Sequence, residues 1–139
     1  MTRNLRGSNH PVVSFMLDQG NRAHADRQNG CDAKEIVLSS GRLDCAMAPG
    51  ETCLVIELKP DNSRAIAKGV SQYRGYVSEL NEELKKPGSS TIKKLIDADS
   101  DFAKCKRFEG RIDCYKLCPT VNDDGEYSEP SAGWRKDCS

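Results

Sequence analysis

The stretch TCLVIELKPDNSRAIAKGVSQYRGYVSELNEEL, residues 52–84, decides the fold of this chain. Its first part, residues 52–58, is almost continuously apolar, which is typical of a central strand covered on both faces. Pro60 ends that strand. Over residues 63–84 the apolar period becomes that of a helix, so the chain has an α/β pattern. The apolar stripe of the predicted helix consists of Ile66, Val70, Tyr73, Val77, Leu80 and Leu84.

The sequence upstream of this unit predicts a helical region and a hairpin. Residues 14–29 mix apolar and polar side chains around Gly20, which indicates one short helix or two. A β-favouring run at 35–38 and a second run at 42–48 are separated by turn residues at 39–41. This arrangement is typical of two paired strands.

The sequence downstream is less regular. We expect a second helix over residues 90–97, which resumes over residues 101–106, and then a late strand over residues 111–117. Beyond Pro119 the composition is typical of loops. Trp134, the single tryptophan of the chain, is expected to anchor local packing there.

Length and charge limit the class of protein. The chain of 139 residues fits one domain, and we expect residues 1–12 to be a polar lead-in, with the form of a cut from a longer protein, before a single domain over residues 13–139. The 21 basic and 21 acidic residues cancel, which excludes a histone-like protein that binds nucleic acid through bulk charge. No apolar run approaches the roughly 20 residues that span a bilayer. The first ten residues also lack the apolar stretch of a signal peptide.

The seven cysteines give an odd count, so at least one thiol is expected to be free or to pair outside the chain. Cys45 and Cys53 lie within apolar runs, where we expect small buried hydrophobes. In the tail, Cys114, Cys118 and Cys138 leave the presence of one disulfide open.

Three charged residues carry the candidate chemistry. Glu57 and Lys59 end the buried strand and stand two residues apart, so they face the same side. If Asp44 reaches the same place from the hairpin, the two carboxylates repel each other, and a divalent cation relieves that repulsion. Oxygen ligands favour Mg²⁺ or Mn²⁺ over zinc. Lys59 would then orient, or help to deprotonate, a water that attacks a phosphodiester.

The order of three short motifs resembles the PD-(D/E)xK nuclease superfamily, and specifically its RecB-type exonuclease branch. That branch has a GxxD strand, a (D/E)xK strand and a helix with QxxxY, which correspond to GRLD at 41–44, ELK at 57–59 and QYRGY at 72–76. A histidine in a GxxxH context lies upstream in that branch and contacts the metal, and GNRAH at 20–24 has this form. The resemblance covers residues 20–84.

This resemblance implies a restriction-endonuclease-like α/β fold with an αβββαβ core, in which helices flank a mixed central sheet. It implies that Asp44, Glu57, Lys59 and Gln72 are catalytic. It also implies that Asp44 and Glu57, together with His24, bind Mg²⁺ or Mn²⁺.

Two further helix residues are assigned to substrate binding by the same resemblance, namely Tyr76 and Lys68. Gln72 and Tyr76 are four residues apart and therefore share one helix face. They lie at the edge of the apolar stripe, where side chains that line a cleft are expected.

The expected activity is metal-dependent hydrolysis of DNA. Small size, cysteine content and a cut-like N-terminus further resemble the C-terminal toxin domain of a bacterial polymorphic or secreted effector. This implies a carrier polypeptide or secretion apparatus, action in the target-cell cytoplasm, and a cognate immunity protein. The alternatives are a repair, recombination or phage nuclease of the same fold, a ribonuclease, and a non-catalytic nuclease-like binding module.

Overall fold

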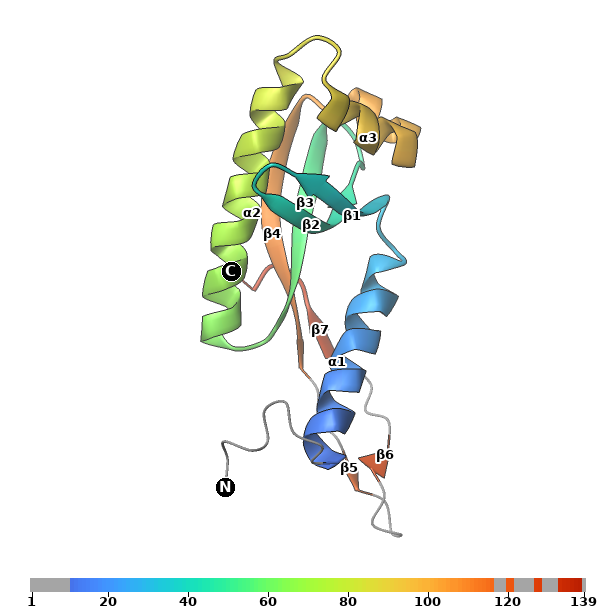
Figure 1. Ribbon diagram of the computed structural model, residues 1–139, viewed down its shortest axis with the longest axis vertical. Coiled ribbons are helices and arrows are strands. Elements are labelled where there is room, and N and C mark those ends of the chain that lie inside the picture. The colour runs from blue at the N-terminus through green and yellow to red at the C-terminus, as the bar shows by residue number, and fades with distance from the viewer. Residues whose placement is uncertain (1–10, 117–119, 122–126, 129–132, 139) are drawn as a thin grey trace.

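A five-stranded mixed sheet forms the centre of the molecule, in the order β1-β2-β3-β4-β7 (Figure 1). The structure is a computed structural model that describes residues 11–116, 120–121, 127–128 and 133–138, with side chains described at residues 20–116 and 133–138. Only β3 and β4 run parallel, and the other neighbours in this sheet are antiparallel. Its strands are β1 (Ala33–Leu38), β2 (Gly41–Met47), β3 (Thr52–Pro60), β4 (Arg107–Lys116) and β7 (Gly133–Arg135).

Helices and a separate small ladder complete the described chain. The helices are α1 (Pro11–Gln28), α2 (Ser63–Leu84), α3 (Ser90–Ala98) and the 3₁₀ helix η2 (Ser100–Lys104). Strands β5 (Thr120–Val121) and β6 (Tyr127–Ser128) pair only with each other. The order α1, β1 to β3, α2, β4 is the predicted αβββαβ arrangement, with α3 and η2 inserted before β4. None of the described helices has the length and apolar character needed to cross a membrane.

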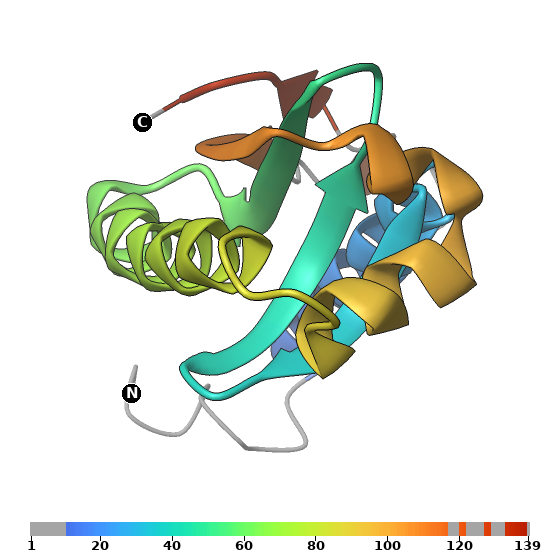
Figure 2. The same ribbon diagram turned by 90° about the horizontal axis from the view of Figure 1, so that it is seen from above.

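The predicted central strand is confirmed. β3 has a neighbour on each side, and its side chains alternate between two buried clusters. Val55 joins the larger cluster, which α2 and α3 cover, whereas Ile56 and Leu58 join the smaller one on the opposite face. Helix α2 packs along β3 and β4, while α3 packs against β1 and α2 (Figure 2). A strand buried on both faces explains the nearly unbroken apolar run.

Helix α2 begins and ends where the period predicted, at Ser63 and Leu84. Asn62 caps its start, because the side-chain oxygen accepts a hydrogen bond of 2.8 Å from the amide of Ala65. The sequence predicted one short helix or two around Gly20 in the α1 region. The structure shows one continuous helix of 18 residues that passes through Gly20. A single helical glycine costs only about 1 kcal/mol relative to alanine, which the rest of a helix can offset.

Two downstream predictions needed correction. Residues expected to resume a helix at 101–106 form the 3₁₀ helix η2, which is too short to show helical periodicity. The late strand begins at Arg107, four residues before the predicted start, because it pairs in register with β3 from Thr52 onward. Trp134 packs against the smaller core cluster, as predicted, but it does so from strand β7 and not from a loop.

The hairpin that carries Asp44 is fastened to α2. The Tyr76 hydroxyl donates a hydrogen bond of 3.2 Å to the carbonyl of Arg42, and the Glu79 carboxylate accepts from the amides of Ser39 and Ser40, each at 2.8 Å. Gly41, between these contacts, has φ of 144°, and a Cβ there would lie 2.8 Å from the Tyr76 hydroxyl. Only glycine fits this turn, because both the backbone angle and the space exclude a side chain.

The expectation that Cys45 and Cys53 are free buried thiols was wrong. Cys45 bonds to Cys31 and Cys53 bonds to Cys105, with Cα atoms 5.6 and 5.7 Å apart. A third disulfide joins two other cysteines, Cys114 and Cys138. Cys118 and residues 1–10 of the predicted lead-in lie outside the described residues, and α1 begins inside that lead-in at Pro11. Apolar context identified buried positions correctly, but pairing depends on strand positions that local sequence does not encode.

Candidate active site

Two carboxylates meet where β2 separates from β3. The ladder pairs Cys45 with Ile56, and the next rung in the same register places Asp44 opposite Glu57. Leu58 donates its amide to Oδ2 of Asp44 at 3.1 Å, and Oε1 of Glu57 lies 3.5 Å from the amide nitrogen of Asp44. The Glu57 side chain is almost fully buried, with the residue only 1% exposed. The two predicted acidic groups therefore converge on one point.

This proximity shifts the pKa values of Glu57 and Asp44 in opposite directions. Burial and the adjacent Asp44 carboxylate together raise the pKa of Glu57 to about 9. Burial alone would also raise the pKa of Asp44, but hydrogen bonds with His24, Glu57 and the Leu58 amide outweigh burial and hold that pKa below its ordinary value. Near neutral pH, Glu57 therefore keeps a proton while Asp44 is ionised.

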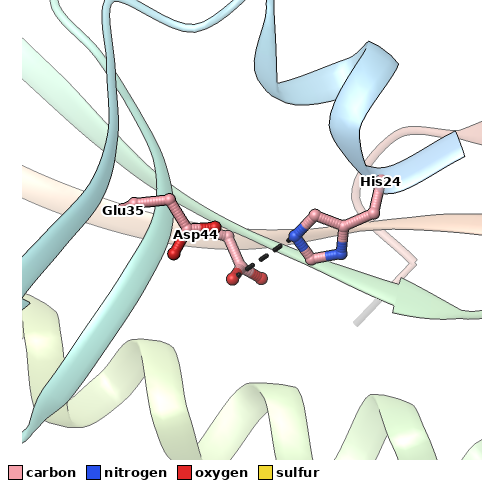
Figure 3. Close-up of side chains that lie close together, drawn as sticks. All are labelled: His24, Glu35 and Asp44. Carbon is pink, nitrogen blue, oxygen red and sulfur yellow. Dashed lines mark ion pairs between the residues drawn. The ribbon is translucent and has the colours of Figure 1, made fainter. Parts of the chain in front are cut away.

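His24 reaches the same carboxylate from α1. Its Nε2 lies 3.5 Å from Oδ1 of Asp44, and the two side chains are 30% and 17% exposed. Figure 3 shows the imidazole pointing from the helix toward Asp44. The continuous α1 helix thus places His24 beside the strand carboxylate.

Sequence reasoning missed a third acidic group, Glu35. One ligand atom from each of His24, Glu35 and Asp44 lies within 4.8 Å of the others (Figure 3). In the β1–β2 register, Lys34 pairs with Cys45 and Ile36 with Leu43, so Glu35 stands opposite Asp44. The hairpin had been predicted, and counting its register back from the turn at 39–41 would have found Glu35.

Glu35 is held in an unusual conformation. Its φ is 53°, in the left-handed region that a non-glycine residue rarely adopts. Its Oε1 accepts a hydrogen bond of 2.7 Å from Nε2 of Gln28. Its Oε2 forms an ion pair of 2.8 Å with Nε of Arg42. Backbone strain of this kind persists only where the surrounding structure fixes it.

Gln28 supports both acidic residues of the hairpin. It is only 7% exposed, and its amide donates to Oε1 of Glu35 and, at 3.0 Å, to the carbonyl of Asp44. Gln28 follows His24 by four residues and therefore lies on the same face of α1. One helical turn thus carries both the imidazole and the amide that position the hairpin carboxylates.

Replacing Gln28 by alanine is expected to lower the free energy of unfolding by about 1–3 kcal/mol, because the buried Asp44 carbonyl loses its side-chain donor and Glu35 loses one of its two partners. Urea denaturation followed by circular dichroism measures this change. Asn29→Ala is the matched control, since Asn29 is exposed and its side chain accepts an exposed hydrogen bond from Lys34. Equal stabilities of the two variants would contradict the supporting role of Gln28.

Lys59 lies on the α2 side of β3. A Cβ at Gly69 would come within 3.0 Å of Cγ of Lys59, so the missing side chain lets the lysine stem pass along the helix. The Lys59 charge acts on Glu57 and opposes the rise of its pKa. Among the described residues, no ion pair engages the Lys59 amine. The amine is therefore within electrostatic reach of Glu57 and has no ion-pair partner in the described part of the chain.

The predicted helix residues occupy different environments. Oε1 of Gln72 is buried and has no hydrogen-bond partner within the described part of the chain. Tyr76 is 3% exposed and belongs to the core, which differs from the cleft-lining position expected. Burial, and then the charges of Glu57 and Asp44, raise the pKa of Tyr76. The Tyr76 hydroxyl is therefore buried within electrostatic reach of both carboxyl groups. Lys68 is exposed on the same helix.

The donor set fits a hard divalent cation. Carboxylate oxygens converge with one imidazole nitrogen. Among the described residues no thiolate of the kind that favours zinc adjoins them, because the neighbouring Cys31 and Cys45 are joined as a disulfide. The raised pKa of Glu57 reflects in part its repulsion from Asp44, which a cation would relieve. On α2, the buried oxygen of Gln72 is an acceptor without a partner in the described residues.

Comparison with protein families is consistent with this site. The model of the family described as Restriction endonuclease fold toxin 9 (Tox-REase-9) matches residues 14–97. No curated protein and no solved structure matches the chain. The matched segment includes more than half of the chain and runs from α1 through α3, so every site residue described above lies within it. This chain therefore belongs to the restriction endonuclease fold toxin family.

Proposed function

We propose that this toxin domain hydrolyses phosphodiester bonds of DNA in a reaction that depends on Mg²⁺ or Mn²⁺. The observation that carries the proposal is the pair of adjacent carboxylates, Asp44 and Glu57, with the amine-bearing Lys59 next to Glu57 on the same strand face. Burying one carboxyl group against a second is costly unless a ligand engages the pair. Family membership supports the nuclease class, and the site chemistry supports the metal and the hydrolytic reaction.

Each residue of the site has a distinct proposed role. Asp44 and His24, which cluster with Glu35, would hold the divalent cation. Glu57, which adjoins Asp44 but lies outside that cluster, is proposed as a further ligand. When bound, the cation supplies positive charge that offsets the charge developing on the phosphoryl oxygens. Lys59 orients, or helps to deprotonate, the attacking water.

The α2 residues would act around this centre. Gln72, whose buried oxygen has no partner in the described residues, would accept a hydrogen bond from a bound water or from the Lys59 amine when substrate binds. Tyr76 holds the hairpin through Arg42, and so fixes the position of Asp44 relative to β3. Lys68, which is exposed on the same helix, offers its ammonium group to the substrate backbone.

The biological setting is proposed from the family. We infer that residues 13–139 are a single nuclease domain, delivered by a carrier polypeptide or secretion apparatus to the cytoplasm of a target cell. A cognate immunity protein would block the site in the producing cell. Expression without that partner should therefore kill the host, whereas a repair or phage nuclease would be tolerated.

A plasmid assay tests the proposed chemistry. Supercoiled DNA should be nicked or linearised with Mg²⁺ or Mn²⁺, and EDTA should abolish the reaction. A parallel digestion of RNA determines whether the sugar matters. Cleavage that continues in EDTA would contradict metal dependence, and cleavage of RNA alone would contradict the DNA substrate.

The proton held by Glu57 predicts a characteristic pH dependence of stability in EDTA. Its pKa is raised in the folded state from an ordinary value of 4.5 to about 9, so the folded protein binds this proton more tightly than the unfolded chain does. The resulting stability is complete below pH 4.5 and is lost as the pH rises toward 9, by at most about 1.4 kcal/mol per pH unit. Urea unfolding at pH 5, 7 and 9 measures this slope.

Added Mg²⁺ should flatten the slope, because binding displaces the proton and is therefore stronger at higher pH. Glu57→Gln is the control, since it keeps the shape of the side chain but cannot titrate. The same slope in wild type and in Glu57→Gln would show that another group causes the pH dependence.

A further inference from the structure

Three side chains from separate elements form a stack beside the carboxylate site. The rings of Tyr115 on β4 and Trp134 on β7 have centroids 5.2 Å apart and planes inclined by 57°. The guanidinium of Arg27, on α1, lies 5.0 Å from the centroid of the Trp134 ring. Such an array of aromatic rings and arginine is the kind of surface on which nucleobases stack.

The stack approaches the site from the α1 side of the sheet. Cys114 is the parallel partner of Lys59, so Tyr115, the next residue, lies at the same end of the sheet but faces the side opposite to Lys59, where it packs with Trp134. Arg27 follows His24 by three residues and lies on an adjacent part of the same helix face. The pKa of Tyr115 is raised by burial and by the charge of Asp44, which places its hydroxyl within electrostatic reach of the site.

The stack is rigid but not fully covered. Arg27 is held by an ion pair of 3.1 Å to the carboxylate of Asp113, a residue only 1% exposed. Tyr115 and Trp134 are both half-buried, and the Tyr115 hydroxyl has no hydrogen bond to another described residue. The Tyr115 ring is thus held in place while part of it stays exposed. Such a preorganised side chain loses little conformational entropy when a planar ligand binds.

Positive charge lies on the Arg27 side of the stack. Arg27, Arg111 and Lys136 contribute to the wall of a cavity of about 210 Å³, in which Asp113 is the acidic lining residue. Arg27 and Arg111 share the Asp113 carboxylate, at 3.1 and 3.0 Å, so three cations face one carboxylate and leave positive charge for a phosphate group. The Tyr115 stack and this wall thus offer the two contacts that one nucleotide needs, a surface for its base and cations for its backbone.

We propose that Tyr115, backed by Trp134 and Arg27, binds an unpaired nucleobase next to the reacting phosphodiester. The inference rests on the proposed nuclease function and specifies its substrate class as single-stranded or locally opened DNA. Bases within a duplex already stack on their neighbours, so a duplex can use this platform only where it opens. The alternative role for these side chains is packing that only fastens β7 and α1 to β4.

Intrinsic fluorescence tests the proposal, because Trp134 is the only tryptophan in the chain. Wild-type protein in EDTA is titrated with a single-stranded oligodeoxynucleotide, the same sequence as a duplex, and the corresponding single-stranded RNA. The single-stranded DNA should quench the fluorescence and bind more tightly than the duplex. Tyr115→Leu should weaken this binding about 5- to 150-fold, whereas Tyr115→Phe, which keeps the ring, should bind like wild type.

The matched control is Arg107→Gln at the other end of β4, where Arg107 is exposed and pairs with Glu109. Its binding should be unchanged. Equal affinity for single strand and duplex, or equal affinity of Tyr115→Leu and wild type, would overturn the platform. Single-stranded RNA that binds with the same dependence on Tyr115 would support the platform and relax the choice of sugar.

The binding test and the plasmid assay can fail independently. Binding through Tyr115 without any cleavage would refute the nuclease proposal and leave the platform in place. Metal-dependent cleavage with no preference for single strands would refute the platform and leave the nuclease proposal in place. If Tyr115→Leu does not fold, the comparison of single strand with duplex on the wild-type protein still decides the question.

Discussion

Lys59→Ala and Glu57→Gln should each reduce the rate of metal-dependent plasmid cleavage by about 100-fold or more. The first change removes an amine that acts electrostatically on Glu57 and has no ion-pair partner in the described residues. The second removes a carboxylate that is buried against Asp44. Initial rates of supercoil loss with Mg²⁺, measured at matched protein concentrations, provide the comparison.

Controls at the end of helix α2 separate chemistry from folding. Lys85→Ala and Glu82→Gln break an exposed ion pair of 3.0 Å at the far end of α2, and both variants should cleave like wild type. The free energy of unfolding of Glu57→Gln in EDTA at pH 8 should equal or exceed that of wild type. The glutamine cannot ionise, so the variant avoids the cost of keeping a buried carboxyl group protonated at this pH. Activity that persists in both site variants would refute the assignment of the site.

Removing the Cys53–Cys105 disulfide by the double change to serine should lower the free energy of unfolding by about 4 kcal/mol. This bond links the start of β3 to the residue after η2 across 52 positions of sequence. Cross-links over long loops restrict the unfolded chain most, so this disulfide should contribute more than the bond between Cys31 and Cys45, which spans 14 positions. Urea denaturation of the two double-serine variants measures the difference.

The two disulfides should also differ in their effect on activity. Cys45 follows Asp44 directly, and Cys31 lies three residues after Gln28, so the shorter bond ties the end of α1 to the strand that carries the carboxylate. Its loss should reduce cleavage under conditions where the variant is still folded. The Cys53–Cys105 variant, while folded, should cleave at close to the wild-type rate. Equal losses of activity at equal folded fractions would contradict this division.

The carboxylate pair could be predicted because each step depends on local pattern. Alternation places Glu57 and Lys59 on one face of β3, and the apolar run shows that the face is buried. Asp44 followed from its place in a predicted hairpin next to that strand. Tyr76 was expected at the edge of the apolar stripe of α2, where it would line a cleft. The structure instead buries it against the hairpin, where its hydroxyl donates a hydrogen bond to the carbonyl of Arg42 on β2.

The sequence by itself determined the central strand, the α2 helix and the shared face of Glu57 and Lys59, because periods of two and 3.6 residues are local properties of the chain. The meeting of Asp44 with Glu57 was expected from the order of the motifs, and the β2–β3 register brings it about. Only the tertiary structure decided the position of Glu35, the support from Gln28, the three disulfides and the stack at Tyr115. These contacts join residues from different elements. They depend on the path of α1, the register of β1 and the return of β7 to the sheet, and no local period of side chains encodes such distances.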